Sequence, residues 1–215
     1  QLASKFSLVD KDLNKSGLKE NSMGLSDIDL QATYEYLPEY TYSDYRPRGF
    51  VYSKVTIPTS RSLYDSKSNI FSDVRGMGLY SVSLGNFLLK KLNTVTLKFT
   101  TEWTHYFGKT YSQFKLHDYE KFVLPLGIAY THPDSDFTFG LTDTFSYQTG
   151  KNLTGEINSK SSQEHFWELS TFINYSPNRN EIWSLSYSDS TLIGKNINSP
   201  LYRTVALNYS YVFAL

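Results

Sequence analysis

Long runs of this sequence alternate one for one between apolar and polar side chains, and this alternation limits what the chain can fold into. In the last run, every second residue is apolar or aromatic: Val205, Leu207, Tyr209, Tyr211, Phe213 and Leu215. Successive side chains of a β-strand point to opposite faces, whereas a helix repeats about every 3.6 residues. We therefore expect a strand with one apolar face here, and an all-β chain.

Eight further segments show the same alternation, so nine strands can be assigned between residue 27 and the last residue. The expected strands are 28–41, 51–57, 80–84, 94–107, 121–131, 136–149, 166–175, 182–188 and 204–215. Such runs, bounded by turn-forming residues, are typical of half-buried strands.

The separators between these strands alternate in length. The short, turn-like separators are 43–47, 90–93, 132–135 and 177–180. The long, polar separators are 14–27, 59–76, 108–118, 150–163 and 190–200. A transmembrane antiparallel up-and-down β-barrel has this pattern, because its periplasmic turns are short and its extracellular loops are long. We expect residues 1–215 to form one such domain.

The number of strands is constrained by parity. Bacterial single-chain barrels have an even number of antiparallel strands, so the nine assigned strands need at least one more. The segment 5–10 is the only candidate for a strand that precedes them. Ten strands are therefore expected, with eight, or twelve through a hidden hairpin in 59–76, as alternatives.

Composition agrees with strands as the membrane-spanning elements. Mean hydropathy is −0.41, and no stretch approaches the roughly 18 apolar residues that a membrane helix needs. Alternating strands can still span a bilayer, because the average hides their apolar half. The balance of 21 basic and 21 acidic residues argues against a nucleic-acid partner. Aromatic girdles at the two lipid–water boundaries are expected from Tyr34, Tyr36, Tyr40, Trp103, Phe107, Trp167, Tyr175 and Trp183.

The final run resembles the C-terminal signature of Gram-negative outer-membrane β-barrel proteins, the segment that the barrel-assembly machinery reads. Tyr209, Tyr211 and Phe213 fit that signature, whereas Leu215 stands where the signature ends on an aromatic residue. The resemblance implies a multi-pass protein of the bacterial outer membrane, in contact with its lipid and lipopolysaccharide. The chain is also similar in length to porins for acidic sugars, but its six Arg residues argue against a channel of that kind.

Six ionisable residues fall on the polar faces of the expected strands and are candidates to line a lumen: Asp29, Glu35, Lys54, Lys98, Glu102 and Glu168. Charges of both signs in a confined interior are expected to pair, because an unpaired buried charge is costly. Lys98 and Glu102 are about 13 Å apart along one strand and cannot pair with each other. Each is expected to find its partner among the other four.

The four histidines are candidates for the base of a lipid hydrolase, in which a His–Ser pair acts on an acyl bond. His105 falls on an apolar face near the outer end of its strand, but Trp103 and Phe107, rather than a serine, lie two residues away. The other histidines, His117, His132 and His165, fall in or beside loops and turns. No catalytic residue, metal site or cofactor is therefore expected.

Asp143 interrupts an otherwise apolar face formed by Phe137, Phe139, Leu141, Phe145 and Tyr147. A charge facing lipid at mid-strand is unfavourable. We expect either a β-bulge that turns Asp143 inward or a reversed face over half of the strand.

Two classes of function fit these expectations best. The first is a small porin-like channel for passive diffusion of small polar solutes. The alternative is a closed structural or adhesive barrel whose interior is filled by side chains, with a possible extracellular ligand at the long loops. A lipid-modifying enzyme is a third, weaker reading.

Overall fold

The computed structural model describes residues 2–5, 8–15, 18–38, 45–67, 73–111, 113–156, 158–178, 180–194, 196–198 and 201–211. Side chains are described from residue 25 onward, except those of Leu63 and Tyr211. Tyr40, residues 6 and 7 of the candidate first strand, and residues 212–215 of the C-terminal run lie outside the described residues.

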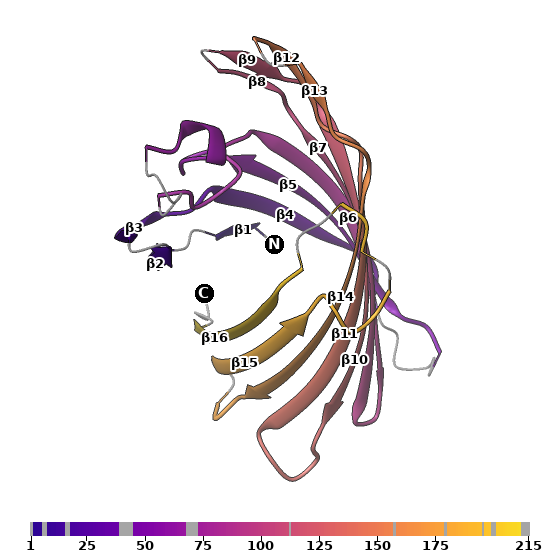
Figure 1. Ribbon diagram of the computed structural model, residues 1–215. Coiled ribbons are helices and arrows are strands. Elements are labelled where there is room, and N and C mark those ends of the chain that lie inside the picture. The colour runs from indigo at the N-terminus through magenta and orange to yellow at the C-terminus, as the bar shows by residue number, and fades with distance from the viewer. Residues whose placement is uncertain are drawn as a thin grey trace.

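One ten-stranded antiparallel sheet dominates the molecule (Figure 1). Its strands, in spatial order, are β1 (Leu2–Lys5), β4 (Ile28–Leu37), β5 (Arg48–Ile57), β6 (Ser81–Leu92), β7 (Val95–Tyr106), β10 (Tyr119–Thr131), β11 (Phe137–Gln148), β14 (Glu164–Tyr175), β15 (Glu181–Asp189) and β16 (Arg203–Tyr211). Each strand pairs with its neighbour in an up-and-down order. The expectation of an all-β, antiparallel fold is confirmed.

The N-terminal region differs from the expectation. The first strand of the sheet is β1 at Leu2–Lys5, not the segment 5–10, and four of its residues pair with β4. The expected loop 14–27 is largely a separate hairpin of β2 (Leu8–Lys15) and β3 (Leu18–Leu25). Polar residues dominate this hairpin, so its strands lack the apolar alternation on which the sequence assignment relied.

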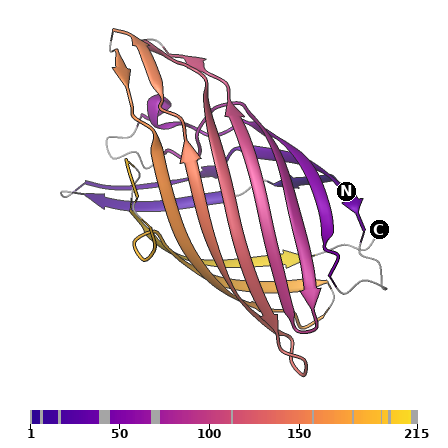
Figure 2. The ribbon, with the colours of Figure 1, turned by 90° about the vertical axis from the view of Figure 1, so that its right-hand side faces the viewer.

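Long and short connections lie at opposite ends of the sheet (Figure 2). At the short end, β6 and β7 are joined through Asn93 and Thr94, and Asn93 has a φ of 53°, which Asn tolerates better than most residues. At the long end, a second sheet continues beyond the main one. It is formed by β8 (Lys109–Thr110), β9 (Phe114–Leu116), β12 (Asn152–Gly155) and β13 (Ser159–Lys160). The long connection between β5 and β6 carries one 3-10 turn, η1 (Leu63–Asp65).

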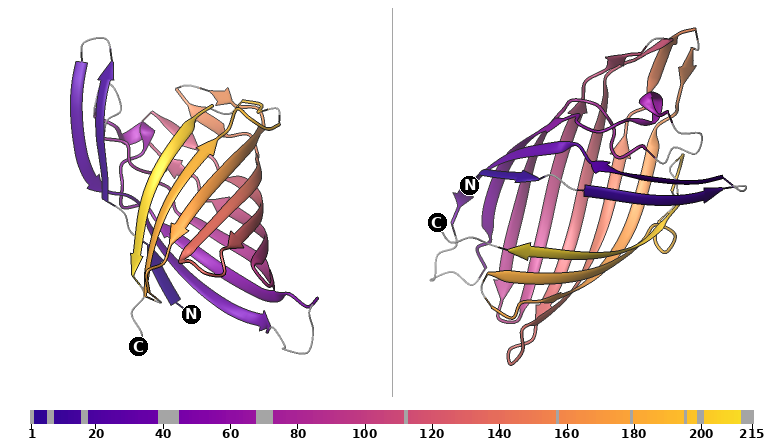
Figure 3. Two further views of the ribbon diagram at one scale, coloured as in Figure 1. Left: turned by 90° about the horizontal axis from the view of Figure 1, so that it is seen from below. Right: turned by 90° about the vertical axis from the view of Figure 1, so that its left-hand side faces the viewer.

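The sheet curls strongly, so that β1 and β16 come to the same side of the molecule (Figures 1 and 3). Among the described residues these two strands are the edges of the sheet and do not pair with each other. The expected ring is therefore curled but not closed here. The expected strand number of ten matches the main sheet.

The two faces of the sheet differ in chemistry and in exposure. The convex, outer face carries the apolar series, and its residues are widely exposed; Val205 and Leu207 are 70% and 69% exposed. The concave, inner face carries mainly polar residues that are less exposed. Apolar burial is small: the buried cluster of the described residues is Leu79, Leu116 and Tyr119, at the end with the long loops. No helix among the described residues has the length and apolar character needed to cross a membrane.

Candidate functional site

The most connected polar group on the inner face is centred on Glu102 of β7. Tyr52 of β5 donates a hydrogen bond from its hydroxyl to Glu102 Oε2 over 2.5 Å, and Lys54 Nζ donates to Oε1 over 3.0 Å. Strand β6 lies between β5 and β7, so both side chains must cross it. Gly85 of β6 makes this possible, because a Cβ there would lie 2.2 Å from Tyr52 Cζ.

Two hydroxyl groups complete the surroundings of Glu102. Thr104 donates to Glu102 Oε1 over 3.3 Å, and its hydroxyl lies 2.8 Å from that of Ser83. Ser83 and Thr104 are buried. The carboxylate of Glu102 is therefore held by donors from two strands, and its charge is matched by Lys54. Such a network fixes side-chain positions, since each group is satisfied only in this arrangement.

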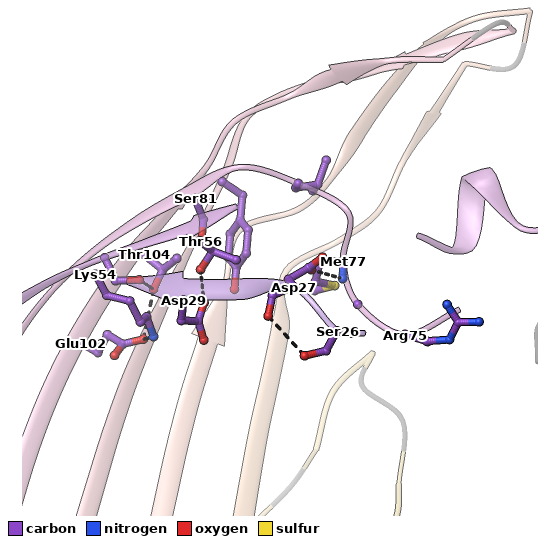
Figure 4. Close-up of a pocket in the computed structure, with 14 residues that line it drawn as sticks. Ser26, Asp27, Asp29, Lys54, Thr56, Arg75, Met77, Ser81, Glu102 and Thr104 are labelled. Atoms are coloured by element: carbon purple, nitrogen blue, oxygen red, sulfur yellow. Dashed lines mark hydrogen bonds and ion pairs between the residues drawn. The ribbon is translucent and has the colours of Figure 1, made fainter. Parts of the chain in front are cut away.

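A cavity of about 310 Å³ lies beside this group, on the side of the long loops (Figure 4). The strands supply Asp29, Lys54 and Glu102 to its wall, and the connection between β5 and β6 supplies Arg75 and Met77. Further hydroxyl groups line it, from Ser26, Thr56, Ser81, Ser83, Thr104 and Tyr106. A cavity of this chemistry suits water or a small polar solute rather than an apolar one.

The connection over this cavity is fixed by Asp27, just before β4. Asp27 Oδ1 accepts hydrogen bonds from the Ser60 backbone N–H (3.1 Å) and hydroxyl (2.6 Å). Its Oδ2 accepts from the backbone N–H groups of Met77 (3.0 Å) and Gly78 (3.3 Å). One carboxylate thus holds both ends of the segment 60–78.

The middle of the same segment is held by Asp73, which accepts hydrogen bonds from the Ser66 hydroxyl, the Lys67 backbone N–H and the Arg61 guanidinium. These bonds, that of Ser66 first, hold the pKa of the Asp73 carboxyl well below its usual range. Asp65 binds Lys109 of β8 over 2.8 Å, which ties the segment to the second sheet. The described part of the connection that lines the cavity is therefore internally bonded.

Of the six residues expected to line a lumen, the structure brings Asp29, Lys54 and Glu102 together at this cavity. Asp29 Oδ1 accepts a hydrogen bond from the Thr56 hydroxyl over 2.7 Å. The expectation that Glu102 pairs with one of the other candidates agrees with its contact to Lys54.

The remaining three candidates lie elsewhere on the inner face. Glu35 forms a two-bond ion pair with Arg48, at 2.9 and 3.0 Å. Glu168 accepts a hydrogen bond from the Ser170 hydroxyl over 2.9 Å and another from Tyr202. The expectation that Lys98 pairs with one of the candidate carboxylates was wrong, because its ammonium group lies over the Phe87 ring, 5.8 Å from the centroid.

Sequence reasoning missed Arg48 as the partner of Glu35, because it assigned the strand from residue 51 onward. Strand β5 begins at Arg48. The signal that could have found it is the even spacing between Arg48, Tyr52 and Lys54, which puts all three on one face.

The histidine side chains contact carboxylates, hydroxyl groups and aromatic rings. His105 lies on the outer face, 3.5 Å from Asp118 and 3.7 Å from Glu120, and its ring packs edge-on against Phe107. His117 Nε2 is 2.8 Å from the Thr154 hydroxyl in the second sheet. Among the described residues, no group of three potential metal-ligating side chains is close enough to hold an ion.

Asp143 remains on the outer face, so neither explanation expected from the sequence is correct. The pairing of β11 with β10 and β14 runs without a register shift, which leaves no bulge, and sets Asp143 opposite Leu126 and Leu169. Its Oδ1 is buried and has no hydrogen-bond partner among the described residues. An apolar groove of about 450 Å³ lies beside it, lined by Leu97, Phe99, Leu126, Ile128 and Leu141.

No protein-family model matches the chain, and no curated protein has significant sequence similarity to it.

Proposed function

We propose that this chain is an integral β-barrel of a bacterial outer membrane that forms a narrow channel for passive diffusion of small polar solutes. The observation that carries this proposal is the spacing of aromatic residues on the outer face. On β11, Tyr147 and Phe137 lie ten residues apart, on either side of an otherwise largely apolar stretch. Ten residues rise about 33 Å along a strand, which at a tilt of about 40° spans about 25 Å, the height of the apolar band in outer-membrane barrels.

The neighbouring strand repeats this spacing. Tyr175 of β14 pairs with Phe137, and His165 pairs with Tyr147. Trp183 and Tyr209 continue the aromatic row beyond Tyr175, and their tilted rings contact each other with centroids 4.6 Å apart. Rings with a polar atom favour the boundary between hydrocarbon and water, so this row suits one interfacial girdle.

The strand order is compatible with a closed ring. Ten strands in antiparallel succession make β1 antiparallel to β16, so the two edges could pair in the same manner as every other neighbour. In lipid, an unpaired edge would leave backbone N–H and C=O groups unsatisfied at a cost of several kcal/mol each. We expect the N-terminal segment to close the ring against β16 in the membrane.

Unsatisfied polar atoms on the inner face support a hydrated interior. Thr100 Oγ1, Gln148 Nε2 and Asn174 Oδ1 are buried and have no hydrogen-bond partner among the described residues. Buried polar groups in proteins nearly always have a partner, and water is the usual one where protein atoms are lacking. These atoms therefore favour an interior that contains water, as a channel requires.

A second candidate function is a closed adhesive barrel whose long loops bind an extracellular ligand. The sheet of β8, β9, β12 and β13 favours it, because ordered loops offer a fixed surface. Tyr64, Tyr111 and Phe114 form an aromatic cluster at that sheet, with ring centroids 5.0 to 5.2 Å apart.

The proposed partners are the lipid and lipopolysaccharide of the outer membrane and, during biogenesis, the barrel-assembly machinery. The proposed function involves no catalytic step, cofactor or nucleic acid. His105 lies near Asp118 and Glu120 but makes no hydrogen bond to a serine hydroxyl among the described residues, which an acyl-transfer site would need.

Conductance across a planar bilayer tests the proposal. The protein is refolded in detergent, its folded state is checked by heat-modifiable migration, and it is added to a bilayer in potassium chloride. We expect discrete, ohmic openings. Electrical silence of a correctly folded sample would contradict the channel and support the closed adhesive barrel.

A further inference from the structure

The inner face is divided into two halves of different chemistry. On β4 to β7 it carries ion pairs and rings, including Glu35–Arg48, Lys54–Glu102 and the stacked rings of Phe50 and Phe87. On β11 and β15 it carries mainly small hydroxyl side chains. Five of these residues and Ser170 of the intervening strand β14 form what we call the hydroxyl wall: Thr142, Thr144, Ser170, Ser184, Ser186 and Ser188.

The strand pairing makes this wall continuous. Thr142 of β11 pairs with Ser170 of β14, Ser170 pairs with Ser188 of β15, and Ser188 pairs with Thr204 of β16. The hydroxyls of Ser170 and Ser188 are 2.8 Å apart. Four neighbouring strands thus present hydroxyl groups in one row across the inner face.

Small side chains also leave more room on this half. Gly127 and Gly140 lie on the inner faces of β10 and β11. A Cβ at Gly140 would lie 2.1 Å from Phe172 Cζ, so the missing side chain lets the Phe172 ring lie against the sheet. The Phe172 ring beside the wall therefore packs over Gly140 of the neighbouring strand.

The electrostatics of the two halves point to an uncharged solute. The charges of Arg48 and Lys54 are each matched at 2.9 to 3.0 Å by a carboxylate, so these two ion pairs exert only a weak net field on ions. Glu168, beside the wall, accepts hydrogen bonds from Ser170 and Tyr202. A hydroxyl both donates and accepts, so a row of hydroxyls can exchange hydrogen bonds with a hydroxylated solute without binding it tightly.

We propose that the solutes carried by this chain are neutral polyhydroxyl compounds, such as small sugars and sugar alcohols, and that they pass along the hydroxyl wall. This inference rests on the proposed channel function and adds a substrate class and a path. The half of the inner face on β4 to β7, which carries the ion pairs, then governs ion discrimination. The hydroxyl wall governs the flux of neutral solutes.

Swelling of proteoliposomes in iso-osmotic sorbitol measures neutral flux, and bilayer conductance measures ion flux in the same preparations. Ser186→Trp places a large ring on the hydroxyl wall, and we expect it to slow sorbitol entry several-fold. Thr171→Trp is the matched control, because Thr171 is an exposed residue on the outer face of β14. It should leave sorbitol entry unchanged.

A second pair of variants tests hydrogen bonding without a change of size. Thr142→Val removes a wall hydroxyl, and we expect sorbitol entry to slow at least about two-fold, the effect of losing one neutral hydrogen bond. Thr171→Val is its control and should leave sorbitol entry unchanged, since Thr171 lies exposed on the outer face of β14. Heat-modifiable migration verifies that every variant is folded.

The outcomes separate the two proposals. A wild-type protein that neither conducts nor admits sorbitol overturns the channel and the inference with it. Conductance with no sorbitol entry overturns the inference alone. Sorbitol entry that is unaffected by both Ser186→Trp and Thr142→Val, in folded variants, also overturns the path along the hydroxyl wall while the channel function stands.

Discussion

At the scale of single residues, side-chain partners depend on contacts that local sequence does not reveal. The polar face of each strand was predictable, because it follows from alternation. The pairing of Glu102 with Lys54 depends on the order of three strands, and the contact of Glu102 with Tyr52 depends also on Gly85. The position of Lys98 over Phe87 depends likewise on a neighbouring strand.

The first prediction concerns Glu102. In Glu102→Ala, Lys54 loses its ion-pair partner and Tyr52 its acceptor. We expect the free energy of unfolding to fall by about 2–4 kcal/mol, somewhat less than for a fully buried pair because both charged side chains are about one-fifth exposed. In a conducting protein, reversal potentials should also shift toward anions. Thermal melting in detergent and bilayer recording are the measurements.

The matched control for Glu102 is Glu120→Ala, because the Glu120 side chain is half exposed near the end of its strand. It should melt like the wild type. A Glu102→Ala protein with unchanged melting temperature and reversal potential would show that the inner-face network contributes neither stability nor selectivity.

The second prediction concerns Asp143, a carboxylate on the apolar outer face with one buried, unpartnered oxygen. We expect Asp143→Leu to raise the free energy of unfolding in lipid by about 1–3 kcal/mol, since acidic residues on the lipid face of barrels are unfavourable by somewhat less than basic ones. The reverse change, Leu185→Asp, should lower stability. Urea unfolding in lipid vesicles measures both; a destabilised Asp143→Leu would mean that the carboxylate has a partner in the membrane.

At the scale of elements, strands with strong alternation were predicted well and polar elements were not. The expected 136–149 and 166–175 correspond closely to β11 at Phe137–Gln148 and β14 at Glu164–Tyr175. The hairpin of β2 and β3 was missed because backbone pairing, rather than an apolar face, defines it. The bonds that organise the segment 60–78 join residues through Asp27 and Asp73, and turn signals alone did not indicate them.

The third prediction concerns that segment and acidity. The folded-state pKa of Asp73 is depressed, so its contribution to stability is complete above the unfolded pKa, near 4, and is lost as pH falls through the lower folded value. The segment should therefore stay closed from pH 9 to about pH 4 and open at lower pH. Brief pepsin digestion between pH 4 and pH 2 should show new cleavage within 60–78.

Asp73→Asn is the control for this acid-dependent opening, because it removes the titrating group. Its cleavage should vary much less with pH over that range. Equal pH dependence in Asp73→Asn and wild type would assign the opening to other carboxylates, such as Asp65, whose pKa is lowered chiefly by its bond to Lys109.

At the scale of the whole molecule, the curled antiparallel sheet was predictable from alternation and from the lengths of the separators, because both follow from a meander with two unlike ends. The same reasoning also predicted closure of the ring, which the described strands do not show. Closure depends on β1, whose described pairing extends over Leu2–Lys5, and on the end of the C-terminal run. The alternation of apolar and polar residues predicts which face of a strand is apolar, but it does not predict which two edge strands pair.

The fourth prediction concerns the orientation of the whole sheet. In the proposed outer membrane, the end with the long loops faces outward and the end with the short turns faces the periplasm. A cysteine introduced at Ser159 should react with a membrane-impermeant maleimide on intact cells, and one at Asn178 should react only after lysis. The opposite result would invert the orientation, and the cysteine-free wild type is the blank.

Exposed apolar residues alternate with polar ones along each strand, and this alternation affects how the unfolded chain interacts with lipid. No single segment is apolar enough to stop in a bilayer during translocation, because polar residues alternate with the apolar residues of each strand. A continuous lipophilic surface arises only when strands assemble and sort their two sides. In the proposed outer membrane, affinity for lipid would then be a property of tertiary structure, and we expect insertion and folding to be one event.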